Sequence, residues 1–201
     1  AVQYHINGFG ENAMAAFSSY FKIENFMYLP ILAFGQAMTT FAGQNIGAGQ
    51  MDRVRKGVKL CLLLSMGTTV VTSSGVLLCG RWLFGLFNPV EEVIACGLQI
   101  IFVTAPLYLL YPIQETLSAV LQGTGKAIVP MIICLGNLCG LRILLLWLLL
   151  SVWHTVPALA AVYPITWACS AICLLLYYWF GRWMPQGLPE KQKSFPFAFF
   201  L

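Results

Sequence analysis

Four charged residues interrupt long apolar stretches of the sequence and are the first candidates for chemistry: Lys22, Glu24, Glu115 and Arg142. A charged side chain at the middle of a bilayer costs about 2.5–3.5 kcal/mol on insertion scales, so each of the four should face protein or water. Counted from the centres of their stretches, Lys22, Glu24 and Arg142 lie toward the outer side of the membrane. We expect Glu24 to pair with Arg142 or Lys22 as a structural tie. A coupling role for Glu24 is the alternative.

Glu115 differs from the other three because no basic residue lies at its own depth. A buried carboxyl without a partner tends to be neutral, which makes Glu115 a candidate for taking up and releasing a proton. It lies in a row of polar residues spaced three, four, three and four apart, which places them on one helix face. The row consists of Tyr108, Tyr111, Glu115, Ser118 and Gln122.

Tyrosines beside an acid suit an organic cation, because cation–π attraction adds to the attraction between opposite charges. We therefore expect Tyr108, Tyr111, Glu115 and Gln122 to bind substrate or coupling ion, together with Gln36 in the first stretch. The alternative is a hydrogen-bonded packing face between two helices.

Enzymatic machinery is not apparent in the sequence. The stretch at 123–126 (GTGK) lacks the remaining residues of a phosphate-binding loop. No Ser–His–Asp arrangement and no zinc-ligand spacing is visible. The sequence therefore predicts neither an enzyme nor a metal site.

Composition explains why the charged residues stand out. The chain has 201 residues, of which 59% are hydrophobic and only 9% are charged, whereas soluble domains carry about a quarter charged residues. So few charges cannot cover the surface of a soluble globule. This excludes an ordinary soluble enzyme, a nucleic-acid-binding protein and a disordered chain.

The long uncharged stretches predict membrane-spanning helices, because each reaches or approaches the roughly 20 residues that a span needs and because backbone amides in lipid must be satisfied within their own element. We expect an all-α polytopic bundle with about five full spans, and residues 1–10 look like the end of a sixth. The five spans are expected near 12–47, 58–80, 93–123, 127–150 and 155–181.

Two of these stretches should not be straight. The first, of roughly 36 residues, would be about 54 Å long as a helix, against a hydrocarbon core of about 30 Å. It must project from the bilayer or bend, and Pro30 and Gly35 are the expected places for a bend. The third contains Pro106 and Pro112 and should be kinked.

Basic residues gather in three segments that five spans would place on the same side of the membrane. They are Arg53, Arg55, Lys56 and Lys59 after the first span, Lys126 after the third, and Arg182, Lys191 and Lys193 after the fifth. The positive-inside rule puts these segments in the cytoplasm. We therefore expect a multi-pass protein of the plasma membrane whose 48–58 loop and C-terminal tail, 184–201, are cytoplasmic.

The glycine-rich stretch at 43–57 (GQNIGAGQMDRVRKG) joins the first span to the basic loop. Gly43 and Gly47 permit close helix approach, and Gly49 permits a turn out of the membrane. Gln44 and Asn45 can satisfy backbone carbonyls at the helix end. Helix termination with small-residue packing accounts for most of the physical role of this stretch.

The chain resembles the C-terminal half of a multidrug and toxic compound extrusion (MATE) transporter. The residues that carry the resemblance are FGENAMAAF at 9–17, KIENF at 22–26, LP at 29–30, GQNIGAG at 43–49, AVLQGTGKAIVP at 119–130, and Arg142. The family motif includes Gly43, Gln44, Gly47 and Ala48. The resemblance covers residues 1–183 and implies one lobe of a two-lobe, twelve-span protein, with the missing N-terminal lobe as its partner in the bilayer.

The resemblance implies secondary active export of organic cations or drugs, coupled to H⁺ or Na⁺ without another cofactor, by alternating access. In a sodium-coupled branch of the family, an acid on the tenth helix aligns with Tyr111 of this chain. A lipid-linked saccharide flippase of the same superfamily and a non-transporting half-protein fragment are the alternatives.

Overall fold

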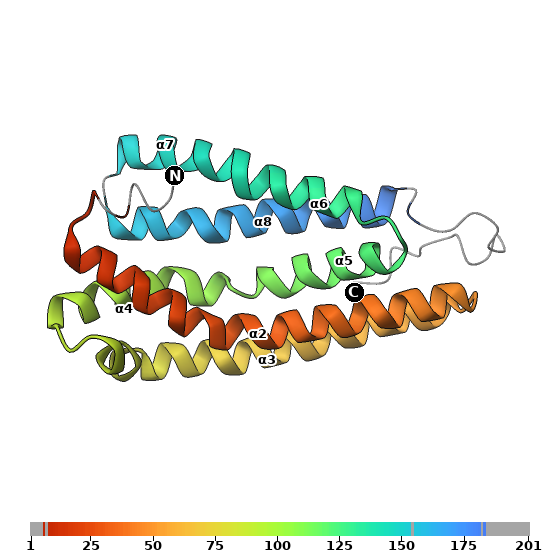
Figure 1. Cartoon of the computed structure of the whole chain (residues 1–201), viewed down its shortest axis with the longest axis horizontal. Helices are drawn as coiled ribbons and strands as arrows, with labels where there is room; N and C mark the ends of the chain where they lie inside the picture. The colour runs from red at the N-terminus through yellow and green to blue at the C-terminus, as the bar shows by residue number, and fades with distance from the viewer. Residues whose placement is uncertain (1–5, 7, 154, 182, 184–201) are drawn as a thin grey trace.

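The computed structural model describes residues 6, 8–153, 155–181 and 183, and every regular element in these ranges is helical. Figure 1 shows the helices packed side by side along one long axis. This confirms the predicted all-α polytopic bundle. The elements are α2 (Glu11–Gly47), α3 (Met51–Phe87), α4 (Glu91–Leu107), α5 (Leu110–Gly123), α6 (Ile128–Leu135), the π-helix η1 (Gly136–Leu141), α7 (Arg142–Val152) and α8 (Val156–Phe180).

Three helices in the described ranges are long and apolar enough to cross a membrane. They are α3, the continuous run 128–152 through α6, η1 and α7, and α8, and the bent pair of α4 and α5 would make a fourth. The predicted first span is a helix, α2, but it is not among these. The reason is its content of polar residues, which include Gln36, Gln44 and Asn45. Five crossings therefore remain a prediction.

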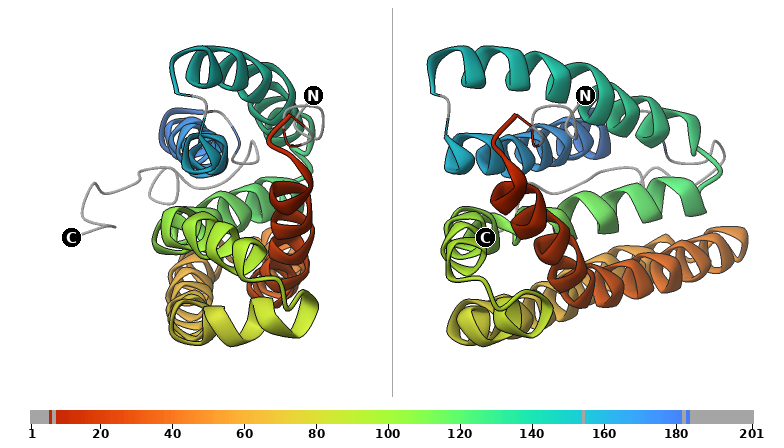
Figure 2. Two further views of the ribbon diagram at one scale, coloured as in Figure 1. Left: turned by 90° about the vertical axis from the view of Figure 1, so that its left-hand side faces the viewer. Right: turned by 60° about the vertical axis from the view of Figure 1, so that its left-hand side comes forward.

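The expected bends occur where prolines remove backbone hydrogen bonds. Figures 1 and 2 show α2 changing direction in its middle part, and Pro30 lies inside this helix. The third predicted span is broken into α4 and α5, which meet at an angle of 52°. Pro106 is in the last turn of α4 and Pro112 in the first turn of α5. The junction lies near the middle of the long axis (Figure 1).

The segments predicted to share one side of the membrane lie at one end of the bundle. Figure 1 shows the turn between α2 and α3, the connection from α5 to α6 and the end of α8 at the right-hand end. Arg55, Lys56 and Lys59 line a shallow cavity there with Asp52. The tail at 184–201 lies outside the described residues, and which compartment this end faces stays a prediction.

Close contact between α2 and α5 depends on two glycines at that end. The Gly43 Cα carries no side chain, and a Cβ built there would lie 3.3 Å from the carbonyl oxygen of Gly123. A Cβ on Gly123 would lie only 2.6 Å from the carbonyl oxygen of Thr39. The prediction of close helix approach at Gly43 is therefore confirmed. Gly47 has open space around it, and Gly49 has φ of +70° and forms the turn.

Gly123→Ala is expected to lower the free energy of unfolding by about 1–3 kcal/mol, because backbone atoms of α2 must move to admit one methyl group. Thermal unfolding of the full-length protein in detergent measures this effect. Gly67→Ala is the matched control, since Gly67 is a helical glycine with nothing within 4 Å of its Cβ position. Equal stability of the two variants would contradict the close α2–α5 packing.

Candidate functional site

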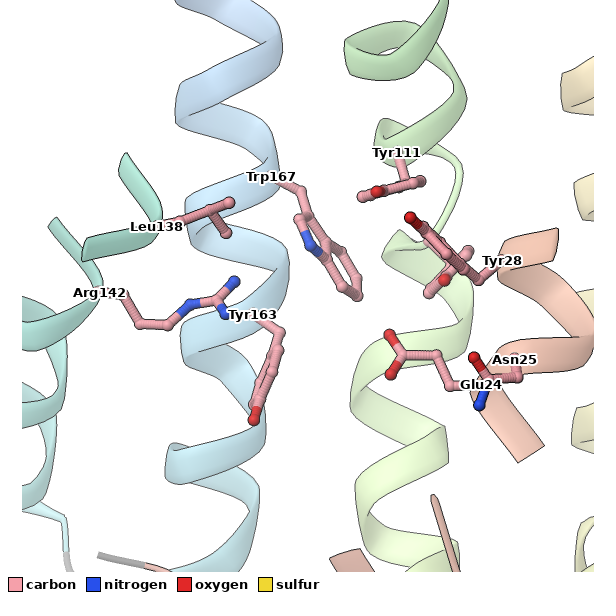
Figure 3. A pocket seen from close by; sticks show the side chains of 9 residues that line it. Glu24, Asn25, Tyr28, Tyr111, Leu138, Arg142, Tyr163 and Trp167 are labelled. Atoms are coloured by element: carbon pink, nitrogen blue, oxygen red, sulfur yellow. The ribbon is translucent and has the colours of Figure 1, made fainter. Parts of the chain in front are cut away.

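A pocket of about 300 Å³ opens where α4 meets α5. Four parts of the chain line it: α2, the α4–α5 junction, the region from η1 to α7, and α8 (Figure 3). The lining residues are Glu24, Asn25, Tyr28, Tyr108, Tyr111, Leu138, Arg142, Tyr163 and Trp167. The break in the helix places Tyr108 between α4 and α5, and Tyr111 follows in the first turn of α5. The pocket is therefore built around an interrupted helix.

Aromatic rings from three elements form the walls of the pocket. The ring centroids of Tyr28 and Tyr111 are 5.7 Å apart. The indole of Trp167 meets Tyr108 edge-on at 4.9 Å and Tyr111 at 5.8 Å. Such T-shaped contacts hold aromatic rings firmly. Ring faces lining a cavity attract cations, most strongly where water is excluded.

The Glu24 side chain reaches into this aromatic pocket from α2, as Figure 3 shows. Its carboxyl faces the hydroxyl groups of Tyr20 and Tyr108, although the buried Tyr20 hydroxyl has no hydrogen bond of good geometry with any described residue. Phenol hydroxyls can donate to a carboxylate or accept from a carboxylic acid. The site can therefore accommodate either protonation state of Glu24.

Arg142 enters from the opposite wall. Its guanidinium lies 4.7 Å above the centre of the Tyr163 ring, and Nη2 donates a hydrogen bond of 2.9 Å to Thr166 Oγ1. The residue follows the π-helix directly, and its N–H donates to the carbonyl of Asn137, five residues earlier. One extra residue in a turn rotates the side chains after it by roughly 100°. The π-turn therefore sets the direction of Arg142, as such turns often do at functional sites.

The expected tie of Glu24 to Arg142 or Lys22 is not a contact ion pair within the described residues, although Glu24 and Arg142 attract one another electrostatically across the pocket. Glu24 and Arg142 point toward one another across the pocket (Figure 3), but none of the ion pairs found within 4.0 Å joins them. Lys22 is exposed and lies 5.1 Å above the Phe87 ring. The pocket lies between the side chains of Glu24 and Arg142, which sequence depth had placed at the same level.

Glu115 does not line the pocket, although the row of polar residues predicted that it would join Tyr108 and Tyr111. It lies one turn beyond Tyr111 and packs on α2, where a Cβ on Gly35 would be 2.6 Å from its Oε1. Glu115 and Tyr111 belong to the same helix, α5, but the Glu115 carboxyl lies against Gly35 of α2 and is not among the pocket-lining groups.

Gln122 and Gln36 are both exposed and lie outside the pocket lining. Gln122 Nε2 donates to Ser118 Oγ at 2.9 Å, which corresponds to the alternative of a hydrogen-bonded helix face. Gln44, Gly47 and Ala48 of the glycine-rich motif are exposed at the end of α2. Among these residues and Gly43, none contributes to the pocket.

Five of the lining residues were not predicted as site residues. They are Asn25, Tyr28, Leu138, Tyr163 and Trp167. One local signal was available, because Tyr28 lies four residues after Glu24 and therefore on the same face of α2. Within the described residues, no group of three or more His, Cys, Asp or Glu side chains could hold a metal ion.

Glu115→Gln is expected to leave the pH dependence of transport as in the wild type, because its carboxyl lies against Gly35 and outside the pocket lining. Glutamine has the same shape and keeps the contact with α2. Transport by the full-length protein at several pH values tests this. A lost or shifted pH dependence would show that Glu115 takes part in coupling transport to the proton.

The chain is similar to known proteins over most of its length. The family model described as MatE matches residues 1–148. The chain is 24% identical over 188 residues to "Probable multidrug resistance protein YoeA" of Bacillus subtilis (strain 168), an alignment covering 90% of this chain and 39% of the relative. Identity is also 24% over 188 residues to "Probable multidrug resistance protein YpnP" of the same organism, covering 94% and 42%.

A mammalian relative is also similar. It is "Multidrug and toxin extrusion protein 2" of Oryctolagus cuniculus, which is 28% identical over 146 residues, covering 64% of this chain and 24% of the relative. The chain thus spans about two-fifths of the length of the two bacterial relatives.

Proposed function

Because the chain belongs to the MatE family, whose members are transporters and not enzymes, we propose that it is one lobe of a secondary active exporter of organic cations. In this proposal the missing N-terminal lobe completes the protein, and the pocket around Glu24 is the cation site of the C-terminal lobe. The observation that carries it is a single carboxyl set among aromatic rings at a helix break.

The chemistry of the pocket supports a cationic ligand. An ionised Glu24 attracts positive charge, and Tyr28, Tyr111 and Trp167 offer ring surfaces to a flat organic cation. Interrupted helices recur at transporter binding sites, since unwound backbone is tolerated only where it lines a cavity. The α4–α5 junction provides such an interruption.

Coupling follows if one carboxyl is shared by two ligands. Glu24 can hold a proton or pair with an organic cation, but it cannot do both at once. A proton arriving from outside would therefore displace the bound cation outward, and the empty protonated site would return to release its proton inside. We favour the proton over Na⁺ because Glu24 is the one acidic residue among the lining residues.

Transport by full-length protein in proteoliposomes tests this function. An imposed proton gradient should drive uptake of a fluorescent organic cation against its own gradient, and a protonophore should abolish that uptake. A sodium gradient imposed without a pH difference should drive none. Uptake driven by a Na⁺ gradient alone would show that Na⁺ and not the proton is the coupling ion. Uptake against the cation's own gradient with neither ion gradient would contradict secondary active export.

A further inference from the structure

We propose that a groove between α2 and α3 binds an anionic phospholipid of the surrounding membrane, with one acyl chain in the groove and the phosphate at Arg53 and Lys56. The groove shares no lining residue with the pocket around Glu24. The inference goes beyond the proposed export of cations, because it concerns a contact between this lobe and a lipid of the bilayer.

The groove is an apolar cavity of about 280 Å³ on the halves of α2 and α3 nearer to their connecting turn. None of its lining residues carries a charged, hydroxyl or amide side chain. Gly57 brings the two helices close together, since a Cβ there would collide with the Phe41 ring. Such a lining suits a hydrocarbon chain, because polar groups buried here would give up their hydrogen bonds to water. The lining residues include Phe34, Ala37 and Phe41 of α2 and Gly57, Leu60 and Leu64 of α3.

The rim and the length of the groove fit a lipid chain. Leu60 is 57% exposed and Leu64 48% exposed, and they lie on a helix long and apolar enough to cross a membrane. Each wall extends over eight residues, 34–41 and 57–64, which is about 10 Å of helix. The hydrocarbon of one leaflet is about 15 Å deep, half of the bilayer core. The groove can therefore hold much of one acyl chain.

Basic side chains stand at the end of the groove where a lipid headgroup would lie. Arg53 precedes Gly57 by four residues, which places it on the same face of α3. Lys56 precedes Leu60 by the same spacing. Both basic side chains are exposed. Arg53 Nη1 donates to Gln50 Oε1 at 2.9 Å, and a guanidinium has further N–H groups that can donate to a phosphate.

The charge at this end favours an anionic lipid over a zwitterionic one. Residues 51–60 hold four basic side chains against one acid, a net charge of +3. The acid, Asp52, pairs with Arg55 at 3.5 Å, so it does not neutralise Arg53 and Lys56. A zwitterionic headgroup would bring a further positive charge beside these residues. The same end of the bundle is predicted to be cytoplasmic, and the cytoplasmic leaflet is the one rich in anionic lipids.

Native mass spectrometry of the full-length protein in detergent tests the headgroup site. It measures the affinities for dioleoylphosphatidylglycerol and dioleoylphosphatidylcholine, which differ only in their headgroups, and the wild type should bind the first more tightly. Arg53→Gln and Lys56→Gln should each lower the affinity for phosphatidylglycerol about fivefold, and the double variant about twenty- to thirtyfold. Lys126→Gln is the matched control, because Lys126 is exposed at the same end of the bundle but lies outside the groove.

Ala37→Phe tests the chain site without changing a charge. Ala37 is an exposed lining residue, so a phenyl ring there fills the groove without displacing a buried side chain. The affinity for both lipids should therefore fall. Ala95→Phe makes the same change at an exposed position of α4 outside the groove and should leave both affinities as in the wild type.

Equal affinity of the wild type for the two lipids, a result that needs no variant, would overturn the inference. An equal loss in Lys126→Gln would also overturn it, because the attraction would then be a property of the whole basic end. Unchanged lipid affinity in Ala37→Phe would show that the groove holds no acyl chain, as expected if the missing N-terminal lobe covers it. All three outcomes would leave the proposed cation export standing.

Discussion

Glu24→Gln is expected to abolish proton-driven export. The amide keeps the shape of the carboxyl and can still hydrogen-bond with the Tyr20 and Tyr108 hydroxyls that the Glu24 side chain faces. It can neither take up a proton nor carry a negative charge. The variant therefore cannot bind the proton or attract the organic cation at this position, and competition between these two for one carboxyl is what couples transport in the proposed mechanism. Affinity for an organic cation should fall by about ten- to a hundredfold. Proteoliposome transport and cation binding by the full-length protein measure the two effects.

The conservative variant Glu24→Asp tests whether transport needs the ionisable carboxyl or the length of the glutamate side chain. It keeps an ionisable carboxyl on a shorter side chain and should retain pH-dependent transport at reduced affinity. Proton-driven export by Glu24→Gln at the wild-type rate would show that another residue carries the proton.

Trp167→Ala is expected to have the largest effect on stability, because the indole is 4% exposed and touches three tyrosine rings. Its centroid lies 4.9 Å from Tyr108, 5.8 Å from Tyr111 and 6.3 Å from Tyr163. Removing a buried tryptophan typically costs about 3–5 kcal/mol of unfolding free energy. Cation affinity should fall as well, since the wall of the pocket loses its best cation–π partner.

Two companion variants make the Trp167 result specific. Trp167→Phe keeps a ring in the wall and should recover most of the stability and affinity. Trp147→Ala removes an indole that is 68% exposed and should change neither. Unimpaired cation binding by Trp167→Ala at a temperature where it stays folded would contradict an aromatic cation site.

Much of the fold was predictable from charge spacing and proline positions. The uncharged stretches predict the helices because lipid leaves the backbone few alternatives, and Pro106 and Pro112 predict the break between α4 and α5. The π-helix at Gly136–Leu141 was not predictable. Its two glycines also fit an ordinary helix, and an i, i+5 turn leaves no periodic signature in so short a segment.

The site was harder to predict because it depends on the directions in which individual side chains point, which the sequence does not give. Tyr108 and Tyr111, which helical spacing had suggested as binding residues, both line the pocket beside the helix break, and their role in binding stays a prediction. Glu115 was assigned to them by helical spacing alone, and spacing does not show that its carboxyl packs against Gly35 of α2 instead of lining the pocket. Trp167 comes from α8, far along the chain, and carries neither charge nor spacing that marks it as part of a site.

Calorimetric binding of an organic cation to the full-length protein tests the shared carboxyl most directly. Titrations at a series of pH values, each repeated in buffers of different ionisation enthalpy, report both the affinity and the protons released. We expect weaker binding as the pH falls and proton release on binding where Glu24 is protonated, with both effects lost in Glu24→Gln. Affinity that is independent of pH, with no proton released at any pH, would contradict it.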